Sequence, residues 1–147
     1  MRAFNRTVLT LLSAAILAGC NLMGQASTPV PHGANPFIAQ PNDSFMTRAD
    51  IRVDSASVKL AESNPPQVML HFAYFQPTPC FSLRVQTSQP DAQNRINVSA
   101  YAVAEKDKPC ALMALSTPLQ ADLNLGSFPK GTYSVWLNGA KVRDVEL

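Results

Sequence analysis

The chain has 147 residues, with 12 lysines and arginines against 10 aspartates and glutamates, and a formal net charge of +2. This length suits one domain of ordinary size. Opposite charges are scattered and no basic run stands in the sequence, which argues against nucleic acid and anionic lipid headgroups as partners.

The first twenty residues have the pattern of an export signal. Arg2 and Arg6 precede an apolar run from Val8 to Ala18. The run is about eleven residues long, whereas a membrane-spanning helix needs about 20. It ends in Leu17-Ala18-Gly19-Cys20, which resembles the lipobox of bacterial lipoproteins. The resemblance implies cleavage before Cys20, a diacylglyceryl group on its thiol and acylation (palmitate) of the new amine. An uncleaved anchor and an ordinary cleaved signal are the alternatives.

A lipobox implies a place in the cell envelope, where the lipid on Cys20 joins the protein to a membrane. Asn21 follows Cys20. In Gram-negative lipoproteins an aspartate at this position implies retention in the inner membrane, so Asn21 favours the outer membrane. In a bacterium with one membrane the protein would face outward from the cell membrane. Loss of residues 1–19 removes Arg2 and Arg6, which leaves ten basic and ten acidic residues.

Residues 20–48 are predicted to form the lipidated cysteine and a flexible tether. The segment has few bulky residues and cannot bury enough apolar surface to offset the entropy of ordering it. Proline also removes backbone donors and disfavours helix, and the segment contains Pro29, Pro31, Pro36 and Pro41. The alternative is a shorter tether, with Phe37 and Ile38 docked on the domain.

Residues 49–147 are predicted to form an all-β domain, an antiparallel β-sandwich of about seven strands. Residues 68–75 are rich in aromatic and β-branched side chains and lie between two prolines. Apolar and polar residues alternate over 81–86, 96–101 and 133–138. A period of two indicates strands with one buried face, and turn residues recur about every eight to twelve positions, as in a sandwich.

The last hairpin has the clearest local signal. Asn138-Gly139 lies between two strand-like runs, and both residues tolerate the positive φ of a type I′ turn. The predicted register pairs Leu137 with Ala140, Trp136 with Lys141, Val135 with Val142, and Ser134 with Arg143. The side chains assigned to the core are those of Tyr133, Val135, Leu137 and Val142.

Gly131-Thr132-Tyr133 at the start of this hairpin resembles the tyrosine corner of immunoglobulin-like sandwiches. The resemblance implies that the Tyr133 hydroxyl bonds to backbone near residues 125–128. Pro129 stands where the family usually has an acidic residue, and no cysteine follows Tyr133. These departures exclude an antibody-type domain and leave a resemblance to a small immunoglobulin-like domain of a bacterial lipoprotein over residues 49–147.

Cys80 and Cys110 are the cysteines left after lipidation. An exported chain meets oxidising conditions, so we expect a disulfide between them. It would close a loop of about 31 residues and contribute about 3.5 kcal/mol in the chain-entropy model. Two free thiols and a metal site are the alternatives. With only His32 and His71 in the chain, the cysteines make a poor zinc site, and no cofactor is expected.

The sequence contains no recognisable catalytic motif, and we expect no enzyme and no catalytic residue. His71 lies within the predicted strand 68–75 and is assigned to its solvent side. Asp50 and Asp54 lie four residues apart, on one face of the predicted strand. A calcium site would need several more oxygen ligands.

Two features are candidates for a binding surface. The first is a stiff loop held by the expected disulfide, because loops commonly carry recognition on such scaffolds. Its candidate residues are Phe75, Pro77, Pro79 and Phe81. The alternative is that Phe75 and Phe81 close the end of the core.

The second candidate is Trp136, which the predicted register turns outward. It would lie opposite Lys141 and diagonal to Arg143. As alternatives, its ring stacks on these cations or is covered by the tether.

Three functions remain open. The first is a non-enzymatic envelope lipoprotein that binds a protein or glycan or inhibits an envelope hydrolase. The second is a structural accessory subunit of an envelope complex, which a broad apolar patch on one sheet face would favour. The third is an envelope hydrolase, which a cleft holding His71 beside a serine or carboxylate would favour.

Overall fold

The structure is a computed structural model that describes residues 35–110, 113 and 115–147. The expected signal peptide 1–19, Cys20, Asn21 and the first part of the expected tether lie outside the described residues. Within the described ranges, no helix is long and apolar enough to cross a membrane.

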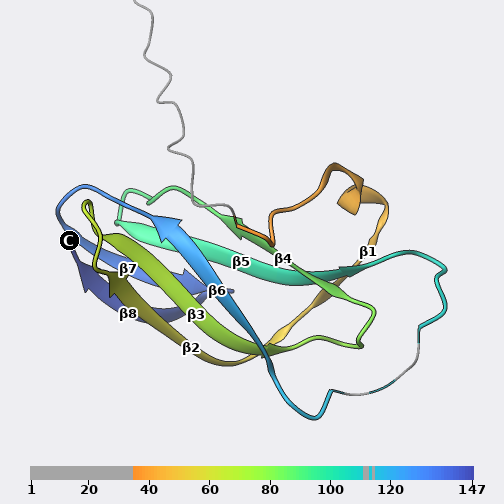
Figure 1. Cartoon of the computed structure of the whole chain (residues 1–147). Coiled ribbons are helices and arrows are strands. Elements are labelled where there is room, and N and C mark those ends of the chain that lie inside the picture. Colours follow the sequence, from red (N-terminus) through yellow and green to blue (C-terminus); the bar gives the residue numbers. More distant parts are fainter. Residues whose placement is uncertain (1–34, 111–112, 114) are drawn as a thin grey trace, which may run out of the picture.

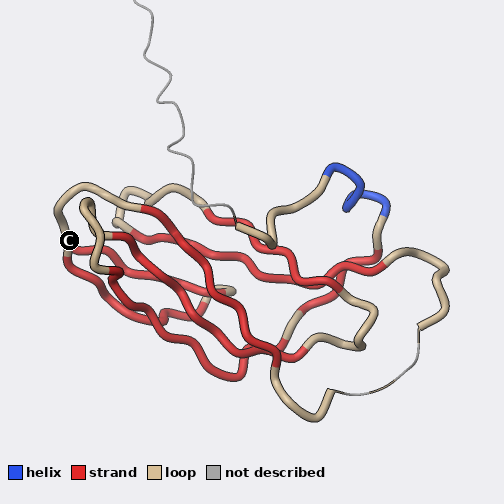
Figure 2. The backbone as a smooth tube through the Cα atoms, in the orientation of Figure 1, coloured by secondary structure: helices blue, strands red, loops and turns tan. Residues whose placement is uncertain are grey.

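The described chain is an all-β sandwich of two sheets that pack face to face, as the alternating sequence pattern predicted (Figures 1 and 2). One short 3₁₀ helix precedes the strands. The elements are η1 (Pro41–Phe45), β1 (Thr47–Asp50), β2 (Arg52–Ala61), β3 (Gln67–Phe75), β4 (Ser82–Thr87), β5 (Arg95–Ala104), β6 (Leu119–Gly126), β7 (Thr132–Leu137) and β8 (Ala140–Glu146).

The smaller sheet has the order β2-β3-β6 and is antiparallel. In the larger sheet, β5 pairs with β4 along one edge and with both β1 and β7 along the other, and β8 lies beyond β7. The other pairs of named strands are antiparallel, as expected, whereas the β5–β7 pairing is parallel. Between β5 and β7 the chain passes through β6, which belongs to the smaller sheet. This crossing lets β7 run in the same direction as β5.

The core lies between the two sheets and takes mainly alternate residues of β3, β4, β5, β6 and β7. Val68, Leu70 and Phe72 of β3 face Ile96 and Val98 of β5, and all five are at most 3% exposed. The alternation read from the sequence therefore identifies the buried face correctly. Tyr133, Val135 and Leu137 are buried as predicted, while Val142 is half-buried against the core.

The predicted register of the last hairpin holds for two pairs and then fails. Leu137 pairs with Ala140 and Trp136 with Lys141, but Val135 pairs with Arg143 because a β-bulge intervenes. The bulge has a physical reason. An unbroken register would place Asp144 opposite Tyr133 on the core side, whereas the bulge places Val145 there, and Val145 is buried.

Residues 35–50, here called the N-terminal strap, are part of the folded domain. The Val85 N–H donates to the Phe37 carbonyl at 2.8 Å, Ile38 forms a parallel bridge with Val85, and β1 pairs with β5. Phe37 packs against the core, while the Ile38 side chain is 53% exposed. The expected flexible tether is therefore wrong for residues 35–48, because Phe37 finds apolar partners and the strap backbone finds strand edges.

Candidate functional site

The strap runs from the β4 edge, where Phe37 meets Val85, to the far edge of β5, where β1 pairs with residues 101–104. It thus crosses the outer face of the larger sheet over that half of β5 (Figure 1). Arg84 of β4 makes a two-point ion pair with Asp43 of η1, with Nε–Oδ2 at 2.7 Å and Nη2–Oδ1 at 3.1 Å. The two side chains are 14% and 10% exposed. The hydrogen bond from Arg84 lowers the pKa of the Asp43 carboxyl below its ordinary value.

Two outward-facing side chains of β5 are buried on the half of the strand that the strap crosses. Ala100 and Ala102 face the core, so Tyr101 and Val103 point to the outer face, yet they are only 5% and 2% exposed. The Arg48 guanidinium lies 3.7 Å from the centre of the Tyr101 ring. The strap thus forms a second, small buried layer on this half of the sheet.

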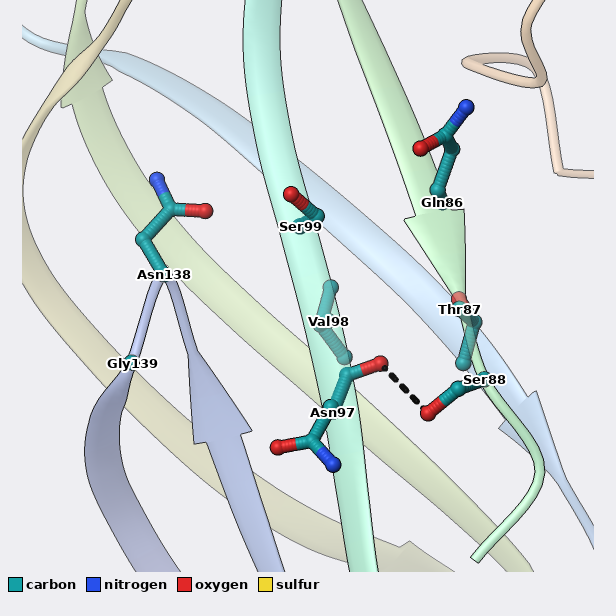
Figure 3. Close-up of a pocket in the computed structure, with 8 residues that line it drawn as sticks. All are labelled: Gln86, Thr87, Ser88, Asn97, Val98, Ser99, Asn138 and Gly139. Atoms are coloured by element: carbon teal, nitrogen blue, oxygen red, sulfur yellow. Dashed lines mark hydrogen bonds between the residues drawn. The ribbon is translucent and has the colours of Figure 1, made fainter.

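The other half of the outer face is open and holds a depression of about 410 Å³ (Figure 3). It lies over the ends of β4 and β5 and the tip of the β7–β8 hairpin. None of its lining residues is ionisable: they are Gln86, Thr87, Ser88, Asn97, Val98, Ser99, Asn138 and Gly139. A neutral surface rich in amides and hydroxyls favours hydrogen bonds over charge pairing.

The hairpin wall of this depression is held by Asn138. Its φ of 49° and the φ of 82° at Gly139 fit the type I′ turn expected from the sequence. Its Oδ1 accepts from the Ala100 N–H at 2.7 Å, and its Nδ2 donates to the Ala100 carbonyl at 2.9 Å. Along this edge of β5, the pairing with β7 stops at Val98 and the pairing with β1 starts at Tyr101. The Asn138 amide therefore fills the gap between the two paired segments.

Trp136 borders the depression on the same face. It pairs with Asn97 across β7 and β5, and both point outward because Val98 and Leu137 face the core. Its indole N–H donates to the Ser134 hydroxyl at 3.0 Å, and the ring is half-buried.

A cation from another strand than expected lies near the Trp136 ring. The Arg95 guanidinium lies 6.0 Å from the ring centre, and Asp91 holds that guanidinium at 2.8 Å. Hydrogen bonds, first from the Arg95 backbone N–H, lower the pKa of Asp91. Trp136 lies opposite Lys141, as predicted, but the predicted diagonal neighbour Arg143 is wrong, because the bulge shifts Arg143 opposite Val135.

The Cys80–Cys110 disulfide is present, with a Cα–Cα distance of 6.0 Å. It ties the loop after β3 to the loop after β5. Within the first loop Pro77 and Pro79 are exposed, while Phe81 packs against the core.

Phe75 lies under the Arg52 guanidinium, 4.3 Å from its ring centre, and is half-buried. Phe81 therefore packs against the core, as in the alternative interpretation, whereas Phe75 stacks against the Arg52 guanidinium. The candidate loop residues do not join Trp136. The loop meets β5 near Val103 and Trp136 meets it at Asn97, which is about 20 Å away along a strand.

His71 lies on the outer face of the smaller sheet, as predicted. Its Nδ1 is 2.8 Å from Asp122 Oδ1 on β6, and Ser57 of β2 is its cross-strand neighbour on the other side. Ser57, His71 and Asp122 thus form a row across three strands. The side chains of His71 and Asp122 are 39% and 73% exposed, so the row lies on an open face in water, and Ser57 makes no hydrogen bond to His71.

Asp50 and Asp54 do not share a strand face. Asp50 ends β1 in the larger sheet and Asp54 lies in β2 of the smaller sheet, because the chain changes sheets at the buried Ile51. Among the residues that the structure describes, no group of three or more histidine, cysteine or acidic side chains could hold a metal ion.

The polar depression is the feature that sequence reasoning missed. The alternation of strands 81–86 and 96–101 already places Gln86, Asn97 and Ser99 outward. Their adjacency depends on the pairing of β4 with β5 and on the parallel return of β7, which no local pattern specifies. Comparison of the chain with family models, curated proteins and solved structures found no significant match.

Proposed function

We propose that this chain is a lipid-anchored lipoprotein of the bacterial cell envelope whose β-sandwich is a non-enzymatic binding module. The anchor rests on Leu17-Ala18-Gly19-Cys20. The binding role rests on one observation: the strap crosses the outer sheet face at residues 101–104 of β5, while an uncharged polar depression beside Trp136 stays open at the other end of that strand. Loops and faces of this kind carry recognition on rigid β scaffolds.

The short distance along the chain from Cys20 to the strap supports this role. The described chain begins at Asn35, two residues before Phe37, whose carbonyl accepts from the Val85 N–H at the β4 edge of the larger sheet. Residues 20–35 can span at most about 50 Å when fully extended. A module held this near a membrane would meet ligands that belong to the envelope itself.

An accessory subunit would present a broad apolar patch on one sheet face. The large apolar side chains that are exposed in the described part of the chain instead lie on separate segments. They are Ile38, Phe45, Leu60, Met113 and Leu119. This dispersion favours the binding module over the structural subunit.

The row Ser57–His71–Asp122 is the observation that favours an envelope hydrolase. A carboxylate that orients an imidazole is half of a nucleophile-activating arrangement. Such an arrangement also needs donors that stabilise an oxyanion in a water-poor site, and this row is on an open face. Covalent labelling of Ser57 by a fluorophosphonate that is abolished by His71→Ala would favour the hydrolase over the binding module as the function of this chain.

Two measurements test the proposed function. Cells expressing the chain are fed a clickable fatty acid, and label is expected on the wild type but absent from Cys20→Ser. A photo-crosslinking residue is then placed at Ser99 on the open half or at Ser57 on the opposite sheet. Cross-links to an envelope component should form from Ser99 and not from Ser57. Label on Cys20→Ser, or equal cross-linking from both positions, would overturn the proposal.

A further inference from the structure

We propose that the depression of Figure 3, together with Trp136, binds a neutral saccharide chain. This inference rests on the proposed function and names its ligand class. Four kinds of observation carry it: the neutrality of the lining, the free amides within it, the fixed hairpin wall and the adjacent indole ring.

The lining carries amides and hydroxyls without an ionisable side chain. A side-chain amide presents a donor and an acceptor in one plane, which matches the neighbouring hydroxyls of a sugar ring. A phosphate or carboxylate ligand would need a cation or a cluster of N–H donors to offset its desolvation. The cations nearby belong to the surroundings of Trp136 and are already paired: Arg95 with Asp91, and Lys141 with Asp144. The lining therefore favours an uncharged, hydroxyl-rich molecule.

Several of these groups are free to bind a ligand. The side chains of Gln86, Asn97 and Ser99 are exposed and make no hydrogen bond to other described residues. Asn138 differs, because both ends of its amide are engaged by Ala100. Its role is to fix the wall against which a ligand would rest, so the site is formed before a ligand arrives.

The Trp136 ring supplies the apolar part of such a site. Its N–H is already bonded to Ser134, so the remaining ring surface offers only π contact. The negative face of an aromatic ring attracts weakly positive C–H groups, which line one face of a pyranose. With Asn97 beside it, the ring can stack on one sugar unit while the amides bind the hydroxyls of the next. The volume of about 410 Å³ falls in the range of ligand sites.

The experiment uses the fact that Trp136 is the only tryptophan in the chain. The lipid-modified chain in detergent is titrated with neutral tetrasaccharides (maltotetraose, cellotetraose and tetra-N-acetylchitotetraose) and with tetragalacturonate as the charged counterpart. We expect a saturable change in tryptophan emission with at least one neutral chain and none with tetragalacturonate. A response to tetragalacturonate alone, or to no saccharide, would overturn the inference.

Matched variants connect the response to the site. Gln86→Ala and Asn97→Ala should each weaken binding about three- to tenfold, as expected for one lost hydrogen bond. Gln120→Ala removes the same amide from the outer face of the other sheet and should change nothing. Trp136→Ala, followed by calorimetry, should abolish measurable binding. Equal losses in Gln86→Ala and Gln120→Ala would refute the site. If Ser99 still cross-links to an envelope component while no saccharide binds, only the ligand class fails and the proposed function stands.

Discussion

The side-chain amide of Asn138 pairs with the backbone of Ala100 as a strand would, through one donated and one accepted hydrogen bond. It lies between the segment of β5 that pairs with β7 and the segment that pairs with β1, along the same edge of β5. Without this amide, the N–H and carbonyl groups of Ala100 on this edge would lose their hydrogen-bond partners, and Ala100 is only 4% exposed. A turn residue therefore also continues the sheet.

Asn138→Gly should separate these two roles, because glycine keeps the positive φ of the turn and loses the amide. We expect a loss of about 1–3 kcal/mol in the free energy of unfolding, since each neutral hydrogen bond contributes about 0.5–1.5 kcal/mol. Urea unfolding measures it.

Asn94→Gly is the matched control for this variant. Asn94 also has a positive φ, 56°, but its amide bonds to none of the described residues. It should change stability by less than about 0.5 kcal/mol. Equal effects of the two variants would show that the Asn138 amide contributes nothing beyond the turn.

The hairpin shows how far the sequence could predict this fold. Asn138-Gly139 has a local signature, so the turn and the first two pairs were predictable. The bulge was not read from the pattern, although the charge at Asp144 already disfavoured the unbroken register. The parallel return of β7 beside β5, which builds the polar depression, depends on long-range pairing that no short segment encodes.

The Asp43–Arg84 pair should make stability depend on acidity. The folded-state pKa of Asp43 is lowered from its ordinary value of 3.8. Its contribution is therefore fully present above that ordinary value and is lost as the pH falls through the lowered folded pKa. The stability difference between wild type and Asp43→Asn should be constant from neutral pH to about pH 5 and shrink in stronger acid. Urea midpoints across this range measure it.

Asp107→Asn serves as the reference for this titration. Asp107 is exposed in the loop after β5, and asparagine suits its φ of 60° equally well. Its curve should run parallel to that of the wild type. If the Asp43→Asn curve is parallel as well, the ion pair does not hold the strap.

The strap also shows why the tether was predicted too long. Residues 35–48 are rich in proline and polar groups, and composition alone indicates a flexible segment. The order comes from contacts that lie far away in sequence: Phe37 with the core, Asp43 with Arg84 and Arg48 with Tyr101. A local pattern holds no information on these partners.

Removal of the disulfide should lower stability. It joins residues 30 apart in sequence, and loss of a native disulfide commonly costs about 2–5 kcal/mol. The double variant Cys80→Ser, Cys110→Ser should melt at a lower temperature than the wild type. A reducing agent should lower the melting temperature of the wild type and leave the double variant unchanged. A reductant effect on both proteins would place its cause outside this bond.

Tyr133 and Trp136 should differ in what they contribute, because they point to opposite faces of β7. Tyr133 is 7% exposed, lies 5.4 Å from the Phe128 ring and donates its hydroxyl to the Pro129 carbonyl at 3.1 Å, just beyond the expected residues 125–128. Tyr133→Ala should cost about 3–5 kcal/mol. Tyr133→Phe, which loses only the hydroxyl, should cost about 1 kcal/mol. Trp136→Ala should cost clearly less than Tyr133→Ala in urea melts, because its ring is half-buried. The reverse order would mean that β7 presents its faces the other way round, which a one-residue slip in register would produce.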